Sequence, residues 1–267
     1  LAAQPLVIES YKDPYKTFET NSMGTLNILE VLRKYNKFKS ALIITTDKVY
    51  DTKNDKRAYK ESDPLGVTDP YGSSKYISEI LTQSYSKSFF NEQNYLKVAT
   101  ARAGNVIGGG DWSENRLIPD VINSLIKNKT IYIRNPKFNR PWQHVLEPLY
   151  GYIKVAETAY ENKSLNNDCW NFGPHITDIR TVHDVTELFC SSWGGSNYIK
   201  HHTDENNPHE AHSLSLDISK AFLKLDWYPK WNIENAVLET VNWYKSYYEE
   251  KDILHLTNEQ IDRYYSS

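Results

Sequence analysis

The sequence predicts an α/β protein with a doubly wound parallel sheet and a smaller α/β lobe. The apolar run at 41–44 and the stretch at 96–101 are predicted to form buried strands. Stretches with helical spacing of apolar residues alternate with these runs, which is typical of a parallel sheet covered by helices. After residue 110 the expected elements become shorter, which indicates a second lobe.

The first part of the chain is expected to build the sheet. A helix is predicted over 21–35 and a strand over 41–44. Residues 51–70 contain two prolines and a glycine and are predicted to form an irregular, exposed loop. A second helix begins at Tyr71 and continues through Tyr85, and the strand at 96–101 follows it.

The second part alternates between the two lobes. Its expected elements are a helix near 118–126, a strand at 131–133, a helix near 145–160, a strand at 169–172 and an amphipathic helix around 233–244. The strand at 169–172 predicts that the chain returns to the first domain near 145–175. We therefore expect residues 1–107 with this return segment to form one domain, and residues 108–267 to form mainly the smaller lobe.

Composition narrows the possible classes of function. The 267 residues carry a formal net charge of −3 with both signs interleaved, so no nucleic-acid-binding face is expected. No apolar run is long enough for a membrane span. Cys169 and Cys190 match no metal or redox spacing and fit a reducing cytoplasm. The histidines near 201–212 are irregularly spaced, so no metal site is predicted.

The residues after the first strand carry the strongest chemical signal. The strand leads into Thr-Thr-Asp-Lys at 45–48, and ligands of such sheets bind at the carboxyl ends of strands. Tyr71 and Lys75 stand one helical turn apart and share a face. A nearby ammonium favours the phenolate, so we expect Tyr71 to act as a base far below its free pKa of about 10. This set can take a proton from a sugar alcohol while a nicotinamide accepts the hydride.

Other stretches complete a family pattern. Together with residues 1–7, 21–25, 101–112 and 140–145, these motifs resemble the extended short-chain dehydrogenase/reductase family, in its branch of sugar-nucleotide 4,6-dehydratases acting on CDP-glucose. The resemblance runs from residue 1 to about residue 244. It implies a Rossmann-type sheet lacking its first strands, because members carry a strand, a Gly-rich turn and further βα units before this point.

The sequence contains no G-x-x-G-x-x-G turn for the cofactor pyrophosphate. The run at 108–110 is followed by Asp111-Trp112 rather than by an apolar helix start, so it does not fit that motif. We expect an N-terminally truncated fragment that alone binds NAD poorly, because the helix-dipole and backbone contacts to the pyrophosphate are missing. The fragment alone is therefore predicted to be inactive.

The resemblance also implies a reaction and its residues. Bound NAD oxidises the nucleotide sugar at C4, water leaves across C5–C6, and the same hydride reduces C6. Tyr71 is the base on the C4 hydroxyl, Thr46 hydrogen-bonds the same oxygen, and Lys75 holds the nicotinamide ribose. Asp47 and Lys48 serve the elimination. Lys48 either acts as a base with a depressed pKa or stabilises the enolate while Asp47 or water moves protons, and both readings stay open.

Binding residues are implied in two groups. The cofactor group is Ala3, Thr45, Tyr71, Lys75 and Ala101. The substrate group is Asn105, Arg116, Arg140 and His212, of which Arg140 offers a fork for phosphate oxygens. His212 stands where related dehydratases carry an arginine. A homodimer formed through helices at 21–35 and 73–90 is also implied.

The favoured function is a lyase that converts CDP-glucose to CDP-4-keto-6-deoxyglucose and water, in deoxysugar synthesis for surface polysaccharide. One alternative is an epimerase or reductase of the same fold. Epimerases of the family generally place small uncharged residues after the Thr or Ser, and the pair Asp47-Lys48 argues against them. The other alternative is a truncated, non-catalytic protein that binds a nucleotide sugar, which the missing Gly-rich turn favours.

Overall fold

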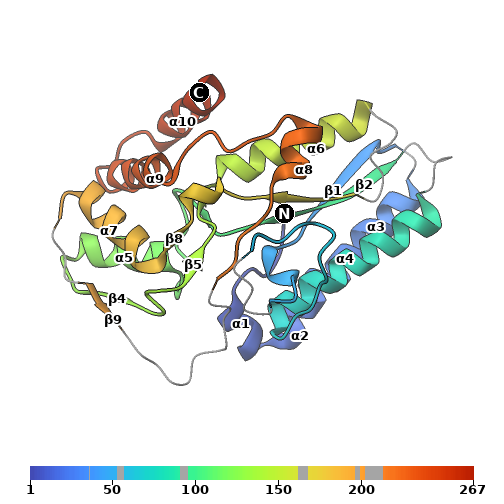
Figure 1. Cartoon of the computed structure of the whole chain (residues 1–267), viewed down its shortest axis with the longest axis horizontal. Helices are drawn as coiled ribbons and strands as arrows, with labels where there is room; N and C mark the ends of the chain where they lie inside the picture. Colours follow the sequence, from blue (N-terminus) through green and yellow to red (C-terminus); the bar gives the residue numbers. More distant parts are fainter. Residues whose placement is uncertain (36, 53–56, 91–95, 162–167, 196–198, 202–212) are drawn as a thin grey trace.

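The computed structural model describes residues 1–35, 37–52, 57–90, 96–161, 168–195, 199–201 and 213–267. A parallel sheet flanked by helices forms one lobe, and shorter strands and helices gather at the other end of the molecule (Figure 1). The predicted α/β class is confirmed. Within the described residues, no helix combines the length and apolar character that crossing a membrane requires.

The main sheet has three parallel strands. They are β1 (Ser40–Ile44), β2 (Lys97–Ala103) and β7 (Cys169–Phe172), in the order β1-β2-β7. The prediction that residues 169–172 return to the first sheet is confirmed. The prediction that β1 is buried is only half right, since all its residues are partly exposed. Among the described strands β1 pairs with β2 alone, so it forms an edge, whereas β2 is buried throughout.

Helices cover both faces of this sheet, because successive residues of a strand point to opposite sides. Val98 packs against α3 (Gly24–Lys34) and against residues of α4 (Pro70–Phe89). Ala99 and Ala101 face α6 (Leu146–Glu161) and α8 (Ser219–Leu225). Figure 1 shows α3 and α4 on one side of the strands and α6 and α8 on the other. The sheet is therefore doubly wound, as predicted.

Short helices precede the first long one. They are α1 (Val7–Lys12), α2 (Pro14–Phe18) and a π-helical turn over Glu19–Met23, which continues into α3. The helix predicted over 21–35 is thus confirmed from residue 24 onward, with a wider turn at its start.

The described part of the loop at 51–70 is irregular, as predicted, but it is not exposed throughout. Tyr59 is only 3% exposed. Its ring stacks on that of Tyr50 with 5.1 Å between the ring centroids, and Leu65 packs in the same apolar cluster. The prediction of an exposed loop was wrong here because the ring of Tyr59 packs against Tyr50, which lies outside the loop.

The second lobe has its own apolar core. Its helices α5 (Leu117–Ile126), α7 (Val182–Trp193) and α9 (Ile233–Tyr248) enclose β4 (Ile131–Ile133), which pairs with β9 (Ile199–His201). The smaller pairs are β3 (Val106–Ile107) with β6 (Gln143–His144) and β5 (Asn139–Arg140) with β8 (Arg180–Thr181). The predicted helices near 118–126, 145–160 and 233–244 and the strand at 131–133 are confirmed.

The C-terminal helix α10 (Ile253–Ser266) is tied to the sheet lobe through one buried carboxylate. Glu147 of α6 is fully buried. Its carboxylate accepts a hydrogen bond from the backbone N–H of Trp231 (2.7 Å) and another from the hydroxyl of Tyr264 (2.6 Å). Because a buried charge needs such partners, Glu147 fixes α10 on α6.

Candidate active site

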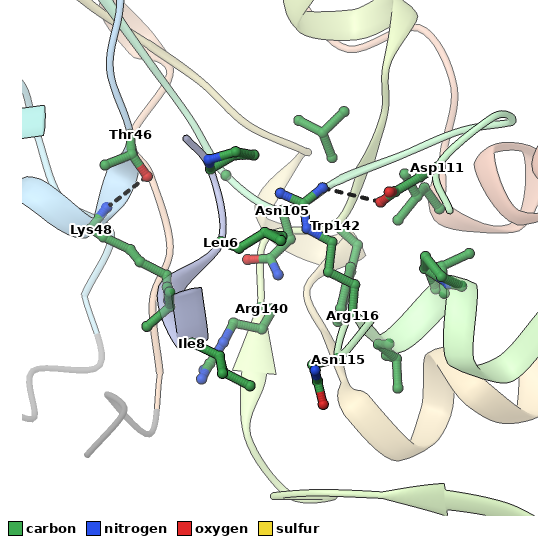
Figure 2. A pocket seen from close by; sticks show the side chains of 18 of the residues that line it. Leu6, Ile8, Thr46, Lys48, Asn105, Asp111, Asn115, Arg116, Arg140 and Trp142 are labelled. Atoms are coloured by element: carbon green, nitrogen blue, oxygen red, sulfur yellow. Dashed lines mark hydrogen bonds and ion pairs between the residues drawn. The ribbon is translucent and has the colours of Figure 1, made fainter. Parts of the chain in front are cut away.

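A cavity of about 450 Å³ lies at the carboxyl end of β1 and is walled by both lobes. Figure 2 shows Thr46 and Lys48 on one side, Arg116 and Asp111 on the other, and Asn105 between them. Most of the predicted site residues line this cavity: Thr45, Thr46, Asp47, Lys48, Tyr71, Asn105, Arg116 and Arg140. The structure therefore brings together residues that are up to 95 positions apart in the sequence.

The chain turns sharply where β1 ends. Asp47–Val49 forms one turn of 3-10 helix, and Thr46 is its N-cap. The Thr46 hydroxyl donates to Oδ1 of Asp47 (3.2 Å) and accepts from the backbone N–H of Lys48 (3.4 Å). This capping arrangement fixes the direction of the Thr46 and Asp47 side chains at the cavity wall.

Asp47 is the most perturbed acid of the cavity. It is 3% exposed, and its Oδ2 has no hydrogen-bond partner among the described residues. Burial raises the pKa of Asp47 to about 6, and the charges of Lys48 and Arg140 offset part of this effect. A carboxyl group with this pKa can hold or release a proton near neutral pH, which suits a general acid.

Tyr71 opens α4 at the floor of the site. Asp69 caps the helix by accepting from the backbone N–H of Gly72 (2.9 Å), and Pro70 occupies the first helical position. The Tyr71 side chain lines the cavity, and Thr46 lies near enough to its phenol to lower the pKa of Tyr71 in part. Thr46 therefore lies between the phenol and Asp47, to which its hydroxyl donates.

The expectation that Tyr71 has a lowered pKa was wrong for this structure. Burial raises the pKa of Tyr71 to about 12, and the charge of Asp47 adds to the rise while Thr46 and Arg116 oppose it. The ammonium of Lys75 is engaged elsewhere, since Nζ donates to the carbonyl oxygen of Ile44 (2.9 Å). Burial also lowers the pKa of Lys75 to about 8.

Only some of the residues predicted to bind a cofactor lie at the cavity. Thr45 and Tyr71 line the cavity, whereas Ala3, Lys75 and Ala101 do not. Ala101 is fully buried in β2, and its carbonyl oxygen accepts from the backbone N–H of Thr45 (2.8 Å). Its side chain is thus part of the core.

The far wall of the cavity is rich in arginine. Arg116, the N-cap residue of α5, forms an ion pair with Asp111 (Nη1 to Oδ2, 3.1 Å), as Figure 2 shows. Arg140 is buried in β5, and Arg134 lines the cavity as well. Sequence reasoning missed Arg134, although three arginines within 25 residues were a visible signal of an anion site. His212 lies outside the described residues.

Gly109 and Gly110 pack against Trp243 of α9, and Gly108 packs against Val145. A β-carbon on Gly109 would overlap the indole ring of Trp243. Gly110 adopts a φ of +82°, in the left-handed region that favours glycine. The run therefore closes the loop onto α9, which agrees with rejecting it as a cofactor turn. Among the described residues, no group of three or more His, Cys, Asp or Glu side chains could hold a metal ion.

Comparison with known proteins now decides the family. A family model described as GDP-mannose 4,6 dehydratase matches residues 1–240. The chain belongs to the GDP-mannose 4,6-dehydratase family. Within this dehydratase family it is similar to CDP-glucose 4,6-dehydratase from Salmonella typhimurium, with 42% identity over 272 residues that cover 100% of this chain and 75% of that protein. The resemblance inferred from the sequence motifs is confirmed.

Solved structures of other proteins share the fold of this chain. A dTDP-glucose 4,6-dehydratase from Streptomyces venezuelae, solved with NAD, matches with a TM-score of 0.82 and 22% identity, over 94% of this chain and 74% of that one. A UDP-glucuronic acid 4-epimerase from Bacillus cereus, solved with UDP-glucuronic acid and NAD, also reaches 0.82 at 22% identity, over 93% and 74% of the two chains. Since a dehydratase and an epimerase share the fold equally, the fold alone does not choose between these reactions.

Proposed function

We propose that this protein is a hydro-lyase that converts CDP-glucose to CDP-4-keto-6-deoxyglucose and water, with NAD as its cofactor. The observation that carries the proposal is Asp47, a buried carboxyl group with a pKa of about 6 in the same cavity as Tyr71 and Lys48. An epimerase has no water to eliminate and needs no such acid. The 42% identity to the Salmonella CDP-glucose 4,6-dehydratase supports the choice of nucleotide.

The cavity fits the nicotinamide end of the cofactor. The ammonium of Lys75 carries three N–H donors, and one of them is bonded to the carbonyl oxygen of Ile44. Lys75 would hold the ribose once its ammonium turns toward the cavity, which Thr45 and Tyr71 line. Bound there, NAD would supply the hydride acceptor for oxidation at C4 and the donor for reduction at C6. We assign cofactor binding to residues 1–107 with the return segment 145–175, and sugar-nucleotide binding mainly to 108–267.

The chain's own residues then move the protons. Tyr71 accepts the proton of the C4 hydroxyl, while Thr46 hydrogen-bonds the same oxygen. Because the phenol has a pKa of about 12 as it stands, we infer that Lys75 must turn from Ile44 toward the phenol and add positive charge.

Elimination follows at the neighbouring carbons. The C5 proton leaves, the C6–O bond breaks, and Asp47 gives its proton to the departing hydroxyl to form water. When C6 is reduced, a proton exchangeable with solvent adds to C5. Lys48 lines the cavity and either takes the C5 proton or stabilises the enolate oxygen.

The test measures the product. The 267-residue chain is compared with a second form, in which it is joined to the part of the Salmonella protein that it does not cover. CDP-glucose and NAD are added in deuterated water. We expect the longer form to yield a 4-keto sugar that absorbs in alkali and carries solvent deuterium at C5. For the shorter form, calorimetry should show weak NAD binding and no product should appear.

Each other outcome points away from the proposal. No product from CDP-glucose in the longer form would refute the lyase and leave a non-catalytic binding protein. A C4 epimer without deuterium at C5 would identify an epimerase. Tight NAD binding by the 267-residue chain would refute the inactivity of that form.

Arg116 should set the affinity for the substrate. Replacing it by Gln removes a charged fork that can bind diphosphate oxygens, so KM for CDP-glucose should rise about 10- to 100-fold with kcat changed little. Arg263→Gln is the matched control, because Arg263 also pairs with a carboxylate, Glu239 (2.8 Å). An equal effect of both variants on KM, or a fall in kcat alone, would contradict this role.

The proposal also covers the oligomeric state and the location of the protein in the cell. We infer a homodimer through α3 and α4, which carry exposed apolar side chains such as Ile28, Val31 and Ile80. A monomeric mass in solution would contradict it. We also infer a cytoplasmic location, which the unbridged Cys169 and Cys190 support. Export of the protein to an oxidising compartment would contradict that location.

A further inference from the structure

A buried ion pair lies next to the proposed site and takes no part in the reaction steps. Glu79 of α4 and Arg102 of β2 face each other with side chains 8% and 3% exposed. The guanidinium donates two parallel bonds, from Nε to Oε1 (2.8 Å) and from Nη2 to Oε2 (2.7 Å). This two-point contact fixes both the distance and the orientation between the helix and the strand.

The pair also holds both ends of the segment that carries the acid. The Thr45 hydroxyl donates to Oε1 of Glu79 (2.6 Å). At the other end, Nη1 of Arg102 donates to the hydroxyl of Tyr50 (2.8 Å). Thr45 and Tyr50 flank residues 46–49, so the turn that presents Thr46, Asp47 and Lys48 is fixed at each side by the same ion pair.

Glu79 connects this turn to the other half of the site. Tyr71, Lys75 and Glu79 follow one another at intervals of four residues on α4, so they share one helix face. A shift of Glu79 relative to Arg102 would therefore displace Tyr71 and Lys75 from Thr46 and Asp47.

We propose that Glu79 and Arg102 are positioning residues, which set the placement of the Tyr71–Lys75 helix face against the 46–49 turn. Stability alone is a weak reason to bury such a pair, since the desolvation of two charges offsets much of their attraction. A fixed geometry between Tyr71 and Asp47, which would exchange protons with neighbouring carbons of one substrate, is a sufficient reason. The kinetic part of this inference rests on the proposed function, and the structural part does not.

The test removes the Tyr50 hydroxyl, which accepts from Arg102 and donates to Oδ1 of Asn171 (2.7 Å), and keeps the Glu79–Arg102 pair. Tyr50→Phe deletes the hydroxyl that Arg102 contacts but leaves the ring, which stacks on Tyr59 and lies under the guanidinium. The matched control is Tyr264→Phe in the C-terminal helix α10. It deletes a buried hydroxyl that is bonded to the buried carboxylate of Glu147, outside the Glu79–Arg102 network.

Two readouts are measured on both variants. Hydrogen exchange followed by mass spectrometry should show the amides of residues 48–50 exchanging about tenfold faster in Tyr50→Phe and unchanged in Tyr264→Phe. In the catalytically competent longer form, kcat should fall about tenfold in Tyr50→Phe with KM within twofold, and stay unchanged in the control.

The other end of the turn gives an independent check by conservative rescue. Thr45→Val should speed exchange at residues 46–48, and Thr45→Ser, which restores the hydroxyl to Glu79, should not. Unchanged exchange in Tyr50→Phe and Thr45→Val, or equal acceleration in Tyr264→Phe, would overturn the inference. If no form of the protein acts on CDP-glucose, the proposed function fails while the exchange data still decide the positioning role.

Discussion

Replacing Tyr71 by Phe is expected to lower kcat by roughly 100- to 10,000-fold, the usual contribution of a positioned proton-transfer group. The variant keeps the ring that lines the cavity and loses only the phenolic hydroxyl. Without that oxygen the proposed base for the C4 proton is missing. KM should change little, because the proposed diphosphate contacts lie on the far wall.

Tyr132→Phe is the control for this result. Tyr132 lines the same cavity from β4 but is exposed at its rim. Its loss of a hydroxyl should leave kcat within about twofold, since it touches none of the proton-transfer groups. Steady-state rates of 4-keto product formation measure both variants. A Tyr71→Phe enzyme that kept more than about a tenth of the kcat would mean that another group is the base.

Replacing Asp47 by Asn is expected to have two opposite effects. The rate of dehydration should fall at least about 100-fold, because Asn has no proton to give to the departing C6 hydroxyl. The free energy of unfolding should rise, because Asn removes a carboxylate that is buried with one unpartnered oxygen. Loss of activity with a gain in stability would separate this residue from one that only supports the fold.

The sign of the pH dependence follows from the pKa of about 6, against an ordinary value of 3.8. The folded protein binds this proton more tightly than the unfolded chain, so the contribution of Asp47 to stability is full below pH 4 and is lost as the pH rises through 6. At pH 8 the buried charge costs about 3 kcal/mol. The gain in Tm from Asp47→Asn should therefore be larger at pH 8 than at pH 5.

Asp63→Asn is the control of opposite sign. The ion pair with Arg57 lowers the pKa of Asp63, so removing that charge should lower Tm at pH 8 or leave it unchanged. Thermal unfolding at the two pH values measures all three proteins. An Asp47→Asn variant that is less stable than the parent at pH 8 would contradict the raised pKa.

The elements that the sequence predicted well are those whose signal is local. The strand at 131–133 and the helix at 118–126 have strong periodicity, and both lie where they were expected. Two missed helices also carried local signals. Thr181 and Asp184 form a capping box at the start of α7, and Asp252 caps α10.

The failures depend on contacts between distant residues. The exposure of β1 depends on which strands pair beside it, and the burial of Tyr59 depends on Tyr50. The raised pKa of Tyr71 depends on the direction of the Lys75 ammonium, which spacing along a helix does not fix. The pairing of Glu79 with Arg102, 23 residues away, is equally invisible in the sequence.

The contact between Arg116 and Asp111 turns substrate entry into an exchange of anions. The guanidinium is already neutralised by a carboxylate of the same loop, so an incoming ligand must offer more negative charge than that carboxylate supplies. A diphosphate carries enough negative charge to compete with Asp111, whereas a free hexose is uncharged and cannot. Under the proposed function, selection for activated sugars would thus begin at the mouth of the site, before any hydroxyl meets Tyr71.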